Sequence, residues 1–176
     1  VPEFEFQDEL YQAEFDEAQM GQVINNIVMN ARQAMEKGGV IRIAASNLNG
    51  DSVKTPPLGK GDFIRITVED SGVGIPEGRL PHIFDPYFTT KPDGTGLGLT
   101  TTFSIIRNHD GYIHVESTPA VGSRFSVYLP AATAGPKTLI SVRKAPVPGR
   151  GRVLLMDDEE LVRNVATRMM VHLGYK

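Results

Sequence analysis

The sequence of 176 residues contains no cysteine, which excludes a disulfide framework and any thiolate metal site. No apolar run approaches the ~18 residues of a membrane-spanning helix. The net charge is only -3, and the lysines and arginines form no basic stripe, so nucleic acid is not expected as a partner. No signal-peptide pattern is present. We therefore expect a cytoplasmic location.

One stretch differs in composition from the rest of the chain. Residues 132–151 contain three prolines and several glycines and small residues, which is typical of a linker. The expected organisation is one domain over residues 1–131, this linker, and a partial second domain over residues 152–176. Because the chain opens on Val1 without a methionine, we expect it to be a fragment of a longer protein.

Hydrophobic periodicity predicts a mixed set of helices and strands before the linker. Asp16 is the expected N-cap of a first helix, and Gly111 should follow the end of a second. The predicted helices span 16–36 and 98–108, and the predicted strands span 40–46, 63–69, 112–116 and 124–129. Residues 47–61 are read as a loop and residues 75–95 as a mobile lid. Since the strands arrive in pairs, we expect an α/β (α+β) sandwich, with a mixed sheet covered by helices on one face.

Two asparagines lie one turn apart on the first predicted helix. Asn26 and Asn30 border its apolar face, four residues from each other. A single asparagine at such a border is usually just solvated. Because asparagine is a poor helix former, a pair in mid-helix costs a few tenths of a kcal/mol per residue and favours a ligand-binding role.

Two glycine-rich segments stand next to predicted elements of regular structure. Asp70, Gly72 and Gly74 come directly after a predicted strand, a pattern that is also common in ordinary turns. The second segment precedes the second helix and could offer backbone N–H groups to phosphates. It consists of Gly94, Thr95, Gly96, Leu97 and Gly98. Its spacing is neither a Rossmann fingerprint nor a P-loop.

In this order, the asparagines, the Asp-Gly pattern, the aromatic lid and the second glycine segment resemble the catalytic domain of sensor histidine kinases. The resemblance covers about residues 4–130. The four motifs of that family fall at Gln22–Ala34 (N box), Asp70–Gly74 (G1 box), Phe84–Lys91 (F box) and Gly94–Leu99 (G2 box).

The resemblance implies a Bergerat-type (GHKL) fold that binds ATP and Mg²⁺. Asp70 would accept a hydrogen bond from the adenine amino group, Asn30 would ligate Mg²⁺, and Asn26 and Lys91 would contact the phosphates. The G1 and G2 glycines would shape the pocket and the lid hinge. Phe84 and Phe88 are assigned only a packing role in the lid. The implied activity is transfer of the γ-phosphate to a histidine, within two-component phosphorelay signalling.

The segment after the linker resembles the opening strand and helix of a response-regulator receiver domain, as found in hybrid kinases. In that family adjacent acids help bind Mg²⁺, so Asp157 and Asp158 are candidates for half of a second metal site. Acids at the start of a helix also favour the helix dipole without any metal. The strand that would carry the phosphate-accepting aspartate is expected beyond Lys176.

None of the four histidines has the surroundings expected of a phosphoacceptor. The implied partners are therefore a histidine-bearing dimerisation domain upstream of this chain and a response-regulator receiver. Two alternatives stay open. One is an ATPase of the gyrase or Hsp90 kind, although the residue that would activate water falls at Asn26, and an amide is no general base. The other is a catalytically silent ATP-binding module.

Overall fold

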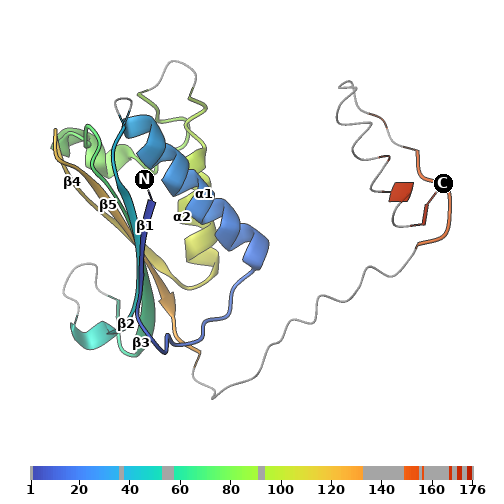
Figure 1. Ribbon diagram of the computed structural model, residues 1–176, viewed down its shortest axis with the longest axis horizontal. Coiled ribbons are helices and arrows are strands. Elements are labelled where there is room, and N and C mark those ends of the chain that lie inside the picture. The colour runs from blue at the N-terminus through green and yellow to red at the C-terminus, as the bar shows by residue number, and fades with distance from the viewer. Residues whose placement is uncertain are drawn as a thin grey trace. The chain divides into compact units, whose positions relative to one another are not determined.

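The computed structural model describes residues 2–35, 38–52, 58–90, 94–132, 149–154, 156, 167, 170–171 and 174–175. The chain divides into two compact units, residues 1–135 and 136–176. Every element discussed below belongs to the first unit (Figure 1). Within the described part of the chain, no helix combines the length and the hydropathy of a membrane span.

The first unit is built on a five-stranded sheet of order β1-β2-β3-β5-β4. Its strands are β1 (Pro2–Phe6), β2 (Ile41–Asn49), β3 (Asp62–Asp70), β4 (Tyr112–Thr118) and β5 (Gly122–Pro130). β1 runs parallel to β2, whereas every other neighbouring pair is antiparallel. The predicted mixed sheet is therefore confirmed.

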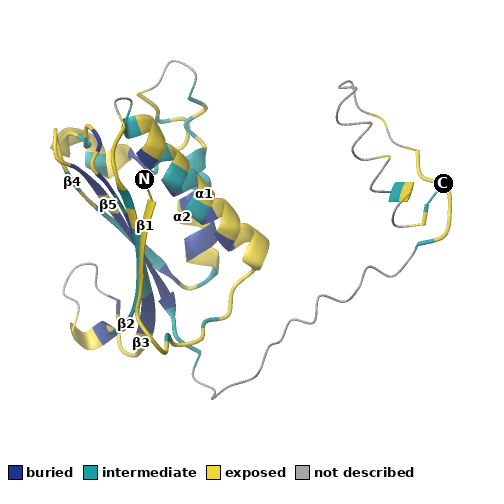
Figure 2. Ribbon diagram, in the orientation of Figure 1, coloured by how far each residue is buried: buried dark blue, intermediate teal, exposed yellow. Residues whose placement is uncertain are grey.

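Two helices, α1 (Glu17–Ala34) and α2 (Gly98–Asn108), lie on one face of this sheet (Figure 1). As predicted, Asp16 caps α1, and its Oδ1 accepts a hydrogen bond from the Gln19 amide at 2.8 Å. The apolar stripe of α1 packs with α2 and with alternate residues of β3 and β5 (Figure 2). The fully buried centre of this core contains Val23, Ile27, Val68, Ile106, Val127 and Leu129.

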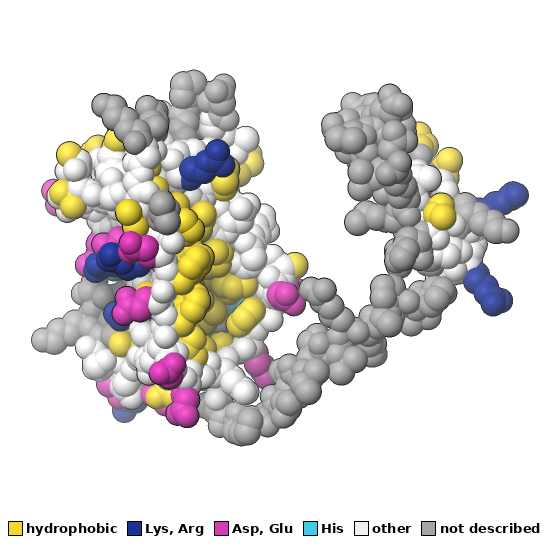
Figure 3. All heavy atoms as spheres, in the orientation of Figure 1, with side chains coloured by type: hydrophobic (Ala, Val, Ile, Leu, Met, Phe, Trp, Pro, Cys, Tyr) yellow, Lys and Arg dark blue, Asp and Glu magenta, His cyan; other side chains and the backbone are white. Residues whose placement is uncertain are grey.

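β1 lies outside the strands predicted from the sequence and forms one edge of the sheet. Its sequence alternates acidic and aromatic residues, the period of a strand. All five residues are exposed, and Phe4 and Phe6 are 63% and 58% accessible. Figure 3 shows apolar side chains in a band on this side of the unit, where β1 forms the open edge of the sheet.

The two segments read as loops contain short regular structure. β2 continues to Asn49 and is followed by a 3-10 turn at Gly50–Ser52. The lid contains a 3-10 helix at Glu77–His82, after which Ile83 is buried in the core. Phe84 and Phe88 pack against that core as half-buried residues, the packing role predicted for them. This first part of the lid is thus anchored on the domain.

Candidate functional site

The middle of α1 places both predicted asparagines beside the core. Asn26 and Asn30 are half-buried, one turn apart, next to the buried stripe of the same helix. The Asn26 Nδ2 donates to the Gly98 carbonyl at 2.9 Å, and it lies 3.4 Å from the Thr102 hydroxyl. The N-terminus of α2 is therefore fixed directly against α1.

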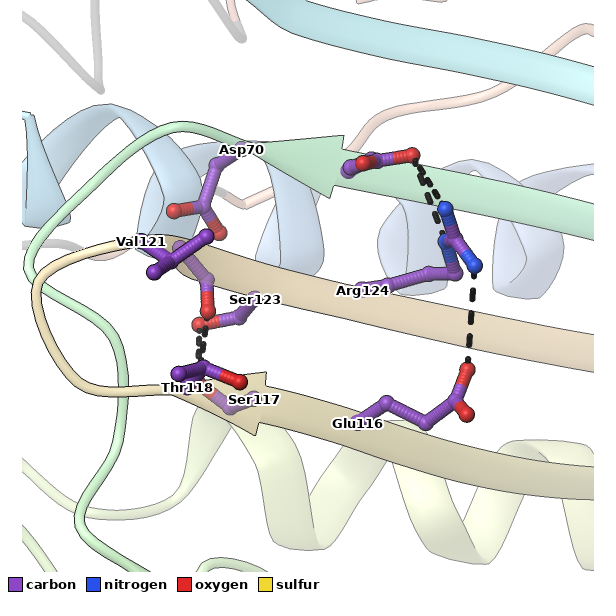
Figure 4. A pocket seen from close by; sticks show the side chains of 9 residues that line it. Asp70, Glu116, Ser117, Thr118, Val121, Ser123 and Arg124 are labelled. Atoms are coloured by element: carbon purple, nitrogen blue, oxygen red, sulfur yellow. Dashed lines mark hydrogen bonds and ion pairs between the residues drawn. The ribbon is translucent and has the colours of Figure 1, made fainter.

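Asp70 ends β3, the central strand of the sheet, and its side chain is buried (Figure 4). Its Oδ1 accepts a hydrogen bond from the Gly72 amide at 2.8 Å. Burial raises the pKa of this carboxyl, backbone hydrogen bonds from Gly72 and Ser123 oppose the rise, and the Glu69 carboxylate adds to it. The outcome is a desolvated acceptor that the loop after β3 holds in place.

The glycines after Asp70 allow the loop to pack against the end of α1. A Cβ at Gly72 would lie 2.7 Å from both the Ala34 carbonyl oxygen and the Asp70 Oδ1. Val73 donates its backbone N–H to the same Ala34 carbonyl at 3.1 Å. Gly74 has a φ of +69°, which favours glycine. The loop after Asp70 therefore packs directly on the C-terminal end of α1.

Sequence reasoning missed two serines of this site, Ser117 and Ser123. The β3–β5 register pairs Ser123 with Asp70, and Ser117 Oγ lies 3.0 Å from Ser123 Oγ. Ser117 Oγ also accepts the Ile75 N–H at 2.8 Å, so β4 holds the loop after Asp70. The available signal was Ser123 itself, a polar residue that continues the alternation of buried apolar residues on β5.

A hollow of about 210 Å³ opens at this end of the sheet. Asp70, Ser117 and Ser123 lie on one side of it, while Arg124 pairs with Glu69 at 3.0 Å and with Glu116 at 3.9 Å (Figure 4). Its volume is below the ~300 Å³ at which ligand pockets begin, and neither α1 asparagine lines it. The hollow therefore lies beside the buried carboxylate and does not include the asparagines of α1.

The second glycine segment leads directly into α2. Tyr87 donates its N–H to the Gly96 carbonyl at 3.1 Å, and Gly96 has a φ of +67°. Thr95 and Leu97 are exposed, Gly94 is half-buried, and α2 begins at Gly98. Lys91, Asp157 and Asp158 lie outside the described residues, so the roles predicted for them stay predictions.

The described residues contain no group of three or more His, Cys, Asp or Glu side chains that could hold a metal ion. A bound Mg²⁺ would need other oxygen ligands, because this ion prefers octahedral oxygen coordination and keeps several waters. An asparagine amide oxygen together with nucleotide phosphates meets that requirement. The side chains of α1 thus fit a metal that arrives with its nucleotide.

The mixed sheet, the helix pair and the buried acid at the end of the central strand define an α/β sandwich with a polar site along α1. Residues 15–133 match the family model "Histidine kinase-, DNA gyrase B-, and HSP90-like ATPase", which covers more than half of the chain. The chain belongs to this family, and its homologues place it with the histidine kinases.

Three relatives illustrate the similarity. Sensor kinase CckA of Brucella abortus (strain 2308) is 34% identical over 181 residues, covering 95% of this chain and 19% of that protein. The catalytic domain of histidine kinase ThkA superposes with a TM-score of 0.60 at 34% identity, covering 74% of this chain and 78% of that one. Full-length ShkA in complex with AMPPNP gives 0.61 at 25% identity, covering 99% and 34%. This chain spans a quarter or less of the curated relatives it matches.

Proposed function

We propose that this chain binds Mg-ATP and donates the γ-phosphate to a histidine on a dimerisation domain of the same protein. The observation that carries the proposal is the buried Asp70 carboxylate, which lies opposite Ser123 and is followed by a loop that packs on the end of α1. A desolvated carboxylate is a strong acceptor for the 6-amino group of adenine. Guanine has a carbonyl oxygen at that position, which is itself an acceptor and would be repelled by the carboxylate.

Asn26, Asn30 and Lys91 would serve the phosphates. The Asn26 amide donates to Gly98, so α1 and the N-terminus of α2 meet where the resemblance expects phosphate. Mg²⁺, held by the Asn30 oxygen and the phosphates, would neutralise charge on the transferred group. ShkA, one of the similar structures, contains the ATP analogue AMPPNP.

The reaction we infer is an in-line displacement. An imidazole nitrogen of the acceptor histidine attacks the γ-phosphorus, the bond between the γ-phosphorus and the bridging oxygen breaks, and ADP leaves with the electron pair. The imidazole proton passes to solvent. Because Asn26 cannot act as a general base, water attack is unaided and hydrolysis by this chain alone should be slow. That distinguishes a kinase domain from an ATPase of the gyrase or Hsp90 kind.

We further infer that residues 152–176 open a receiver domain after the linker at 132–151. The alignment with sensor kinase CckA supports this inference, because it extends over 95% of the chain and thus into residues beyond the family match. In this reading the phosphoryl group passes from the histidine to an aspartate of a receiver.

Thermal unfolding with and without nucleotide tests the proposal. At a hundred times the dissociation constant, Mg-ATP should stabilise the fold by ~2.7 kcal/mol, a rise of roughly 10 °C for a domain of this size. GTP should give a much smaller shift, and EDTA should reduce the effect of ATP. Phosphate release should stay near the rate without protein. An unchanged melting curve in millimolar Mg-ATP would reject the proposal, and rapid phosphate release would favour the ATPase.

A further inference from the structure

Thr100 lies in the first turn of α2, where its hydroxyl reaches two separate stretches of backbone. Its Oγ1 donates to the Phe84 carbonyl at 3.1 Å and lies 3.4 Å from the Gly96 carbonyl. Phe84 lies in the part of the lid that packs on the core, and Gly96 directly follows the lid. One side chain therefore ties the anchored part of the lid and the residue after the lid to the helix.

The backbone at this point is held in an unfavourable conformation. Tyr87 has a φ of +64°, rare for a bulky residue, although its side chain is 74% exposed. Its N–H donates to the Gly96 carbonyl at 3.1 Å. A conformation of this kind persists only where surrounding bonds impose it, and the Thr100 contacts flank it on both sides. We call residues 84–87 together with Gly96 the lid neck.

The same helical turn also contacts the asparagine helix. Gly98, two residues before Thr100, receives hydrogen bonds at its carbonyl from Asn26 at 2.9 Å and from Thr102 at 3.0 Å. Residues 84–87 of the lid neck and Asn26 are thus hydrogen-bonded to the same stretch of chain at the start of α2, the neck residues at Thr100 and Gly96 and Asn26 at Gly98. A displacement of the neck would change the position of the glycine segment relative to Asn26.

We propose that Thr100 is a positioning residue of the nucleotide site, which fixes the lid neck on α2 and thereby sets the phosphate-facing backbone beside Asn26. The inference rests on the proposed function, because it presumes that phosphates bind there. The inference predicts that the Thr100 hydroxyl contributes to binding of the ATP phosphates. It should not contribute to binding of adenine, which is assigned to Asp70 at the end of β3.

The test uses the full chain with three variants. Thr100→Val keeps the shape and removes the hydroxyl, Thr100→Ser keeps the hydroxyl, and Thr101→Val is the matched control. Thr101 is the next residue on α2, and its backbone N–H donates to the Leu97 carbonyl at 2.9 Å. The substitution Thr101→Val leaves this main-chain hydrogen bond in place. Affinities for Mg-ATP and for adenosine are measured by calorimetry or competition, and hydrogen exchange is followed over residues 84–90.

We expect Thr100→Val to weaken Mg-ATP binding by about fivefold or more, the scale of one lost hydrogen bond, and to leave adenosine within about twofold. Amides of the neck should exchange faster in Thr100→Val, whereas Thr100→Ser and Thr101→Val should resemble the parent. An equal loss for ATP and adenosine would show a merely structural role and overturn the inference. Unchanged ATP affinity in Thr100→Val would overturn the inference about Thr100 and leave the proposed function standing. Failure of the parent to bind Mg-ATP would overturn both.

Discussion

Among single side chains, Asp70 has the least ordinary surroundings, because it is a carboxylate that is only 5% exposed at the end of a strand. Asp70→Asn should weaken ATP binding by about fivefold to tenfold, since a charge-assisted hydrogen bond of ~1.5 to 3 kcal/mol is replaced by a neutral one of ~0.5 to 1.5 kcal/mol. The preference for ATP over GTP should shrink with it, as measured by calorimetry.

Glu69→Gln is the matched control for that variant. Glu69 is the adjacent acid, but it is more exposed than Asp70, and its carboxylate is already paired with Arg124 at 3.0 Å. Its replacement should leave ATP affinity nearly unchanged. Equal losses from the two variants would mean that general negative charge, and not a directed hydrogen bond from adenine, attracts the nucleotide to this end of the sheet.

Burial at Asp70 also predicts a pH dependence of stability. Because burial raises its pKa, the folded protein holds this proton more tightly than the unfolded chain does. The carboxyl therefore stabilises the fold at pH values below its unfolded pKa, and this contribution is lost as the pH rises through its folded pKa. Without nucleotide, the melting temperature of Asp70→Asn relative to the parent should be higher at neutral pH than near pH 4. The opposite trend would contradict the raised pKa.

How far the site can be read from sequence differs between residues. Asp70, Asn26 and the glycines stand in short local patterns, and the order of these patterns along the chain was sufficient to select them as candidates. Ser123 is 53 positions from Asp70 in the sequence and reaches it only through the β3–β5 register. Pairing between distant strands depends on the whole sheet, and no local pattern encodes it.

Between elements, His109 joins α2 to the start of α1. Its Nδ1–H donates to the Ile105 carbonyl at 2.8 Å, and its Nε2 accepts the Asp16 N–H at 3.0 Å. His109→Ala should lower the free energy of unfolding by about 1 kcal/mol, because the Asp16 amide at the α1 cap loses its acceptor. Since both ring nitrogens are engaged, incubation with γ-labelled ATP should leave His109 unlabelled. Chemical denaturation and mass spectrometry check the two expectations.

His82→Ala provides the comparison. His82 pairs with Asp85 at 2.8 Å, but both side chains are more than half exposed, and exposed pairs contribute little. This variant should change stability by less than about 0.5 kcal/mol. If His82→Ala lowers the free energy of unfolding as much as His109→Ala does, the hydrogen bonds of His109 between α1 and α2 do not specifically stabilise the fold.

At the same scale, the helices and the antiparallel strands were predicted from sequence, whereas β1 was missed. The periodicity of α1 and α2 comes from one buried stripe each, and the caps mark their ends. β1 lacks a buried face, so its alternation of Glu and Phe was not recognised as part of the sheet. Its pairing with β2 is parallel and joins residues about 39 positions apart, such as Pro2 and Ile41, which only the assembled fold defines.

For the whole molecule, we expect the first unit to bind nucleotide without help from the second. The family match ends at residue 133, and the described residues of the proposed site, from Asn26 to Ser123, all belong to the unit that ends at 135. A chain truncated after Gly135 should therefore bind Mg-ATP within about twofold of the full chain, a difference of ~0.4 kcal/mol. It should also show the same rise in melting temperature with nucleotide.

The matched comparison removes residues 1–6 instead. This deletion removes the edge strand β1 and leaves the β2 edge unpaired, so the variant should melt at a lower temperature. Loss of ATP binding on truncation after Gly135 would show that the nucleotide domain extends into the second unit and that the boundary proposed at residues 132–151 is wrong.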